Sequence, residues 1–139
     1  MRTILASGYF DPLHVGHVEY LEKAKALGDK LIVIVNNDKQ AILKKGKEFM
    51  PFKERIKILE SLKSIDSVIP SIDEDKTVCK TIEFIAEKEK IDIFAKGGDR
   101  SASEIPEKAI CDFLGIKIID SLGEKIQSSS FLIKKAEKK

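Results

Sequence analysis

The chain has few of the residues that mark secreted, metal-binding or membrane proteins. Its 139 residues include two cysteines, two histidines and no tryptophan. Cys79 and Cys111 lack C-x-x-C spacing, so we expect free thiols rather than a disulfide or a zinc site. No apolar run approaches the roughly 18 residues that a membrane-spanning helix needs. The first apolar run stops at Gly8 and lacks the pattern of a signal peptide, which leads us to expect residence in the cytoplasm.

The chain also lacks a strong excess of charge of either sign. Lysine and arginine total 25, aspartate and glutamate total 23, and the formal net charge is +2. A strongly basic surface is the usual footprint of proteins that bind nucleic acids or anionic membranes. The composition therefore gives no reason to expect a nucleic-acid or membrane partner.

Segments typical of strands and of helices alternate along the whole sequence. Continuous β-branched runs such as Leu31–Val35 are typical of strands buried on both faces, whereas apolar residues three and four apart indicate helices. Gly115 is a typical residue to end a helix. The expected strands are 3–6, 31–35, 67–71, 91–95 and 116–119, and the expected helices are 18–27, 52–63, a segment around 78–86, 105–114 and 131–136.

This alternation predicts an α/β fold, a Rossmann-like doubly wound five-stranded parallel sheet with helices on both faces, in a single domain spanning 1–139. Ligands bind such sheets beyond the carboxyl ends of the strands, near the point where the strand order reverses. The residues after the first, second, fourth and fifth strands are therefore the candidates for function. Residues 36–38 are expected to form a loop, and the charged segment from Lys44 to Pro51 is expected to be a mobile one.

The most informative segment is Gly8-Tyr9-Phe10-Asp11-Pro12-Leu13-His14-Val15-Gly16-His17. It lies between the first expected strand and the first expected helix, where helix N–H groups and the positive end of the helix dipole favour bound phosphate. His14 and His17 are therefore predicted to contact phosphate. A metal site is disfavoured because zinc usually needs three or four ligands and the chain has no third histidine. A purely structural, capping role for the pair is the other alternative.

The pattern G-x-F-D-x-x-H-x-G-H at this junction resembles the signature of the cytidylyltransferase-like nucleotidyltransferases. The resemblance covers nearly the whole chain, because further elements follow in the order expected for that family. They are Leu27-Gly28-Asp29, Lys45-Gly46, Arg55, Ser64-Ile65-Asp66-Ser67-Val68, Gly97-Gly98-Asp99 and the serine cluster Ser128-Ser129-Ser130. The resemblance implies transfer of a nucleoside monophosphate from a nucleoside triphosphate to a phosphorylated acceptor, with release of pyrophosphate.

The resemblance also implies a role for each matching residue. His14 and His17 would stabilise the transition state, Lys45, with Lys44 or Lys47, would close over the phosphates, and Arg55 would contact the acceptor or the triphosphate. Gly16 would let the backbone approach the phosphates closely. The remaining residues expected to bind nucleotide are Gly8, Tyr9, Phe10, Asp11, Gly97, Asp99, Ser128, Ser129 and Ser130. Mg²⁺ would arrive with the triphosphate, held mainly by phosphates and water.

Several of these residues have plain structural alternatives. Asp11 and Asp99 could be turn residues, and the serines could simply cap the last helix. Arg55 could be a surface charge on a helix, and Lys44 and Lys47 could be solvated lysines.

The sequence departs from the family pattern in two places that bear on the substrate. Tyr9 replaces a residue that is often threonine, serine or cysteine. The segment before the serine cluster lacks the arginine of the glycerol-phosphate cytidylyltransferases, whereas Lys96-Gly97-Gly98-Asp99 looks more like the heptose-phosphate adenylyltransferases, with some likeness to archaeal-type FMN adenylyltransferases. ATP is therefore favoured over CTP.

The predicted function is transfer of AMP to a sugar or polyol phosphate, as in the synthesis of ADP-heptose-type nucleotide sugars. The alternatives are a CTP-dependent enzyme of the glycerol-3-phosphate cytidylyltransferase type, an FMN adenylyltransferase, and a nucleotide-binding module without turnover. A dinucleotide-dependent oxidoreductase would need G-x-G-x-x-G after the first strand, which is missing. The resemblance also implies a homodimer.

Overall fold

The computed structural model describes residues 1–10, 13–45, 50–75, 77–97 and 106–122. Strands and helices alternate along the described chain. In order they are β1 (Thr3–Gly8), α1 (Val15–Lys25), β2 (Lys30–Val35), α2 (Asp38–Lys45), α3 (Phe52–Glu60), β3 (Ser67–Pro70), α4 (Cys79–Ala86), β4 (Ile93–Gly97), α5 (Lys108–Leu114) and β5 (Lys117–Leu122).

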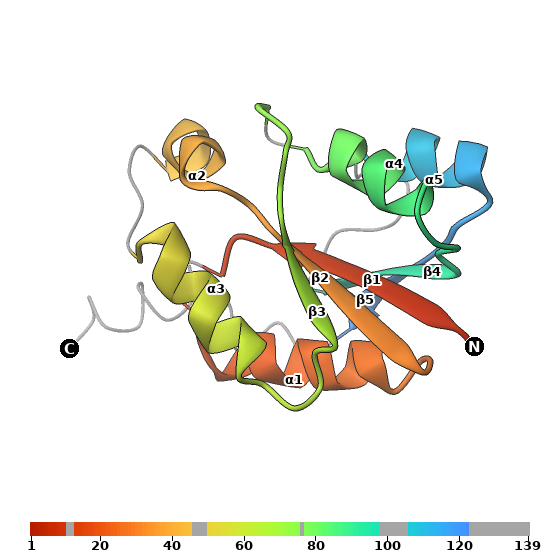
Figure 1. Ribbon diagram of the computed structural model, residues 1–139, viewed down its shortest axis with the longest axis horizontal. Coiled ribbons are helices and arrows are strands. Elements are labelled where there is room, and N and C mark those ends of the chain that lie inside the picture. Colours follow the sequence, from red (N-terminus) through yellow and green to blue (C-terminus); the bar gives the residue numbers. More distant parts are fainter. Residues whose placement is uncertain (11–12, 46–49, 76, 98–105, 123–139) are drawn as a thin grey trace.

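The strands form one five-stranded sheet in the order β3-β2-β1-β4-β5 (Figure 1). Every neighbouring pair is parallel, with Ala6 of β1 opposite Val33 of β2 and Ala95 of β4. The α/β fold with a doubly wound parallel sheet is therefore confirmed. The strand order reverses between β1 and β4, so the carboxyl end of β1 lies at the switch point where such sheets bind ligands.

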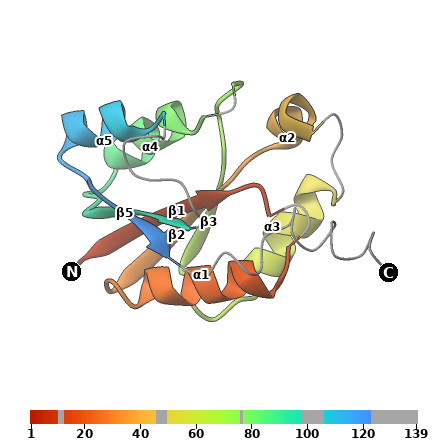
Figure 2. The same cartoon turned by 180° about the vertical axis from the view of Figure 1, so that it is seen from behind.

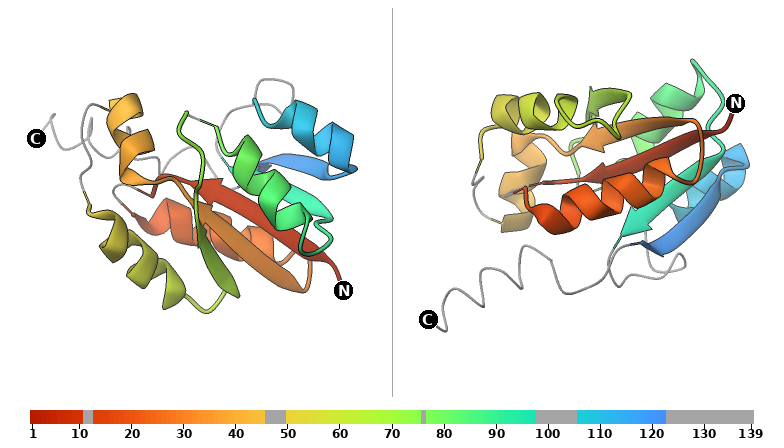
Figure 3. Two further views of the ribbon diagram at one scale, coloured as in Figure 1. Left: turned by 45° about the horizontal axis from the view of Figure 1, so that its top comes forward. Right: turned by 90° about the horizontal axis from the view of Figure 1, so that it is seen from below.

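Helices cover both faces of the sheet, α1 and α3 on one side and α4 and α5 on the other (Figures 1 to 3). Alternate strand residues point to opposite faces, so Ile4 packs in the cluster under α1 and α3 whereas Leu5 packs in the cluster under α4 and α5. Both side chains are fully buried. The continuous apolar runs seen in the sequence follow from this burial on two sides.

Three aspartates, each just before a strand, accept hydrogen bonds from backbone N–H groups at the amino-terminal edge of the sheet. Asp29 accepts from the Arg2 N–H at 2.7 Å, Asp66 from the Leu31 N–H at 2.7 Å, and Asp92 from the Thr3 N–H at 2.8 Å. Asp66 also pairs with Lys25. The hydrogen bond from Lys25, supported by the Leu31 N–H, lowers the pKa of Asp66.

We expect the free energy of unfolding to fall as the pH drops from about 5 to about 3, and Asp66→Asn to make that fall shallower. A carboxylate whose pKa is lower when folded stabilises the protein above its unfolded pKa of about 3.9 and loses this contribution as the pH falls through the folded pKa. Urea unfolding across this pH range measures the slope. Glu22→Gln, on the exposed side of α1, controls for loss of a carboxylate. An unchanged slope in Asp66→Asn would contradict the assignment.

The sequence predicts a loop at Asn36-Asn37-Asp38 and no helix after it, whereas the structure has the helix α2 there. The structure shows that Asn37 and Gln40 form a capping box, with the Gln40 N–H donating to Asn37 Oδ1 at 2.9 Å and the Asn37 N–H to Gln40 Oε1 at 3.0 Å. The N-x-x-Q spacing was the available signal. Because α2 reaches Lys45, the predicted loop of 44–51 begins later than expected, and its residues 46–49 lie outside the described residues.

Other boundaries differ less. Helix α1 begins at Val15 rather than Val18, and α5 begins at Lys108. Gly115 ends α5 in the left-handed conformation, with φ of 73°, as predicted. The expected helix over 131–136 lies outside the described residues.

Cys79 on α4 and Cys111 on α5 are free thiols. In the described part of the chain, no helix is long and apolar enough to cross a membrane.

Candidate functional site

The loop after β1 ends in a helix cap made by two histidines. His14 is the N-cap residue of α1 and has an extended backbone. Its Nδ1 accepts a hydrogen bond from the Gly16 N–H at 3.0 Å, and its own N–H donates to His17 Nδ1 at 3.2 Å. Histidines here take the two places that serine or threonine and glutamate usually fill in a capping box. Both predicted phosphate ligands therefore lie at the start of α1.

The two imidazoles are stacked and supported by a buried phenylalanine. The ring centroids of His14 and His17 are 3.9 Å apart, and those of His17 and Phe10 are 5.0 Å apart in a T-shaped arrangement. Phe10 is 1% exposed and has a φ of 53°, a strained conformation for a bulky residue. A Cβ on Gly8 would lie 2.9 Å from the Phe10 ring. Gly8 therefore leaves the space that seats Phe10 against His17.

The electrostatics at this helix start favour an anion. The first turn of α1 contains no acidic residue, and the helix dipole is positive at this end. His14 Nε2 is buried and has no hydrogen-bond partner among the described residues. Burial lowers the pKa of His14, which favours the neutral ring. Because His14 Nδ1 accepts a hydrogen bond, the proton of the neutral ring is on Nε2. A buried N–H of this kind needs an acceptor, and a phosphate oxygen can be one.

The start of α4 is already occupied by carboxylates. Asp73 accepts from the N–H groups of Lys80 and Thr81 at 2.9 and 3.0 Å, and Glu107 accepts from the Val78 N–H at 3.1 Å. Both acidic side chains are buried, at 2% and 5% exposure. A phosphate at this position would meet two negative charges. Of these two helix starts, α1 is therefore the one suited to bind phosphate.

Arg55 is fully buried on α3, with 0% exposure, although its predicted role was contact with the acceptor or the triphosphate. Its guanidinium donates to the carbonyls of Met50, Tyr9 and Asn36 at 2.7 to 3.1 Å and to Asp38 Oδ1 at 2.6 Å. In this conformation it faces protein rather than solvent. Arg55 thus joins the loop after β1, the end of β2 and the start of α2, and this geometry favours positioning over substrate contact.

Two amide side chains that were not predicted from the sequence, Asn37 and Gln40, attach α2 to the loop after β3. Asn37 Nδ2 donates to the carbonyls of Ser71 and Asp73, both at 3.1 Å. Gln40 is fully buried, and its Nε2 donates to two further carbonyls of the same loop, those of Asp75 and Thr77, at 2.7 and 2.8 Å.

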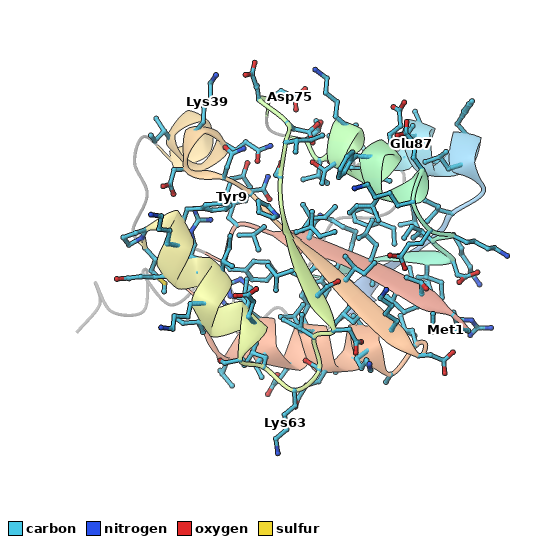
Figure 4. All side chains as sticks on the ribbon, viewed as in Figure 1. Met1, Tyr9, Lys39, Lys63, Asp75 and Glu87 are labelled. Carbon is cyan, nitrogen blue, oxygen red and sulfur yellow. The ribbon has the colours of Figure 1, made fainter. Side chains whose placement is uncertain are left out.

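Figure 4 shows Tyr9, Lys39 and Asp75 at the carboxyl end of the sheet, with Met1 at the opposite end. Hydrogen bonds therefore attach α2 to residues 71–75 and 77 at the carboxyl edge of the sheet.

The structure places the remaining predicted residues as follows. Tyr9 is half-buried after β1, and burial raises its phenol pKa, with smaller contributions from Glu107 and Asp75. Gly97 ends β4, next to the switch point. Lys45 ends α2, but its side chain is outside the description. Asp11, Asp99, Ser128, Ser129 and Ser130 lie outside the described residues.

The described residues contain no group of three or more histidine, cysteine, aspartate or glutamate side chains placed to hold a metal ion. The donor set around His14 and His17 suits phosphate oxygens, and Mg²⁺ bound to a nucleotide can take most of its ligands from phosphates and water. Such an ion would neutralise charge on the departing pyrophosphate.

Comparisons with known proteins identify the family. The family model described as cytidylyltransferase-like matches residues 5–135. The Bifunctional protein HldE of Nitratiruptor is 37% identical over 135 residues, which cover 91% of this chain and 28% of that protein. The FAD synthase of Ferroglobus placidus is 41% identical over 104 residues, which cover 75% of this chain and 64% of that protein. The chain thus spans less than two thirds of either relative.

A solved structure, the lipopolysaccharide core biosynthesis protein of Thermoplasma volcanium, superposes with a TM-score of 0.71 at 26% identity. The match covers 89% of this chain and 98% of that chain. This likeness agrees with the family match over nearly all of the sequence and with the histidine cap at the switch point. The chain belongs to the cytidylyltransferase-like family.

Proposed function

We propose that the chain transfers a nucleoside monophosphate, with AMP favoured, from a nucleoside triphosphate to a phosphorylated sugar or polyol and releases pyrophosphate. The observation that carries the proposal is the pair of stacked histidines at the start of α1, beside the switch point of the sheet. Relatives named Bifunctional protein HldE and FAD synthase support it.

The reaction attaches an acceptor oxygen to the α-phosphorus while the bond to the pyrophosphate oxygen breaks. Negative charge grows on the oxygens around phosphorus and on the leaving group, so catalysis consists mainly of positioning and charge stabilisation. His14 and His17 would donate hydrogen bonds to these oxygens, aided by the positive end of α1. Gly16 keeps a side chain out of the approach to this helix start.

The other contacts are proposed from the family pattern. The binding site for the triphosphate would be completed by Lys45, Gly97, Asp99, Ser128, Ser129 and Ser130. We propose that Asp38, which is paired with Arg55 and has a 42% exposed side chain, lies on the acceptor side of the site. Mg²⁺ would enter with the triphosphate. The homodimer and the cytoplasmic location expected from the sequence remain predictions.

A pyrophosphate-release assay with Mg²⁺ tests the proposal. ATP and CTP are each combined with heptose 1-phosphate, glycerol 3-phosphate, FMN, phosphocholine and phosphoethanolamine. We expect release that requires ATP and a sugar or polyol phosphate. Release with FMN, or with CTP, would establish one of the two alternative transferases instead. Nucleotide binding without release under any combination would favour a binding module, and absence of nucleotide binding would contradict the assignment of His14 and His17.

Lys45→Ala should weaken triphosphate binding or turnover about 10- to 100-fold, because a hydrogen bond to a charged group contributes about 1.5–3 kcal/mol. The KM for the nucleotide and kcat are measured together with the thermal midpoint. Lys39→Ala is the matched control, since Lys39 lies on the same helix in an exposed ion pair with Glu74. Equal effects of the two substitutions, or unfolding of Lys45→Ala, would argue against a phosphate contact.

A further inference from the structure

The cap of α1 constrains the protonation of both active-site histidines. Nδ1 of His14 accepts the Gly16 N–H, and Nδ1 of His17 accepts the N–H of His14. A ring nitrogen that accepts a hydrogen bond carries no proton, so a neutral ring with this bond must carry its proton on Nε2. The same two bonds that begin the helix therefore select one tautomer for each ring.

We infer that the first turn of α1 holds His14 and His17 as neutral Nε2–H tautomers, and that both act on phosphate as dipolar donors rather than as cations. The inference rests on the proposed function for the identity of the ligand. In this assignment the start of α1 and lysines supply the positive charge that the reaction needs. The neutral histidines supply hydrogen bonds of fixed direction.

Two further observations agree with this assignment. His14 Nε2 is buried without a hydrogen-bond partner among the described residues, as expected for a donor kept for a ligand. The rings stack at 3.9 Å, so two imidazolium charges would repel one another.

Protonation of either Nδ1 would disrupt the cap as well. A proton on His14 Nδ1 would face the Gly16 N–H, and a proton on His17 Nδ1 would face the N–H of His14. Each change would replace an accepted hydrogen bond by two opposed donors at the start of the helix. The charged form of either ring is therefore incompatible with the observed cap.

Nitrogen NMR of the full-length protein tests the inference directly, because the chain has only two histidines. A long-range proton–nitrogen correlation spectrum at neutral pH distinguishes the two tautomers and the imidazolium. His14→Asn and His17→Asn assign the two rings. We expect both rings to show a protonated Nε2 and an unprotonated Nδ1, before and after addition of MgATP. A protonated Nδ1 in either ring, free or bound, would overturn the inference.

A pair of substitutions at one position separates capping from phosphate contact. Asparagine can place its amide oxygen near Nδ1, whereas glutamine can extend an amide N–H toward Nε2. We expect His14→Asn to keep the thermal midpoint but lose about 10²-fold or more in turnover, and His14→Gln to keep more turnover at lower stability. The reverse ranking of turnover would overturn the inference by assigning the phosphate contact to Nδ1.

The outcomes also separate this inference from the proposed function. The expected tautomers with Nε2 signals that shift on nucleotide binding, but without pyrophosphate release, would contradict only the proposed transfer. Pyrophosphate release from a protein whose histidines carry a proton on Nδ1 would contradict only the inference. Bound nucleotide that shifts neither Nε2 signal would overturn the phosphate role assigned here.

Discussion

Arg55→Ala should lower the free energy of unfolding by about 3–5 kcal/mol, as expected when a buried charged side chain that donates several hydrogen bonds is removed. The substitution removes the guanidinium that donates to the carbonyls of Met50, Tyr9 and Asn36. It also leaves a cavity where a fully buried side chain stood. Because small domains are stable by only about 5–15 kcal/mol, this is a large part of the total.

Urea unfolding of Arg55→Ala and Arg55→Lys measures the effect, with Lys53→Ala as an exposed control on the same helix. Lysine keeps the charge but lacks the planar group that reaches several acceptors at once, so it should lose most of the same stability. A stable Arg55→Ala variant with a raised KM for the acceptor or triphosphate would contradict the positioning role. It would support the contact with the acceptor or the triphosphate expected from the sequence.

His17→Ala should reduce turnover at least about 10²-fold, by analogy with the removal of one oxyanion-hole donor. The variant also loses the acceptor for the His14 N–H, which should cost about 1 kcal/mol of stability, as for other N-terminal caps. Single-turnover rates and thermal midpoints of the same preparation separate the two effects.

Val15→Ala is the matched control for His17→Ala, because Val15 is 53% exposed in the same first turn of α1. Its turnover should stay close to that of the unaltered protein. Near-native turnover of His17→Ala would remove His17 from the catalytic machinery. Turnover lost only in proportion to unfolded protein would assign it a purely structural role.

The fold could be predicted from the sequence because its core strands are buried on both faces. Burial of β2 requires the uninterrupted apolar run Leu31–Val35, which is visible without a structure. The helix α2 was missed because its cap uses asparagine and glutamine rather than a more common pair. Its sequence, Asp38–Lys45, has a polar character that also suits a loop.

The position of the two histidines at the strand–helix junction was also predictable, but the burial of Arg55 was not. The position of His14 and His17 between a strand and a helix is local information, and the structure brings them together at the start of α1. The burial of Arg55 depends on three segments that meet only in the folded protein. No periodicity in the sequence separates a buried arginine that bonds to backbone carbonyls from one that binds phosphate.

The central claim is that the bond from the α-phosphorus to the pyrophosphate oxygen breaks at this site. Parallel reactions with ATP radiolabelled at the α-phosphorus or at the γ-phosphorus, each with Mg²⁺ and the acceptor found in the pyrophosphate assay, test it most directly. The account predicts that the α label appears in the acceptor product and the γ label in pyrophosphate. Label from the γ position in the acceptor, or in free orthophosphate, would contradict it.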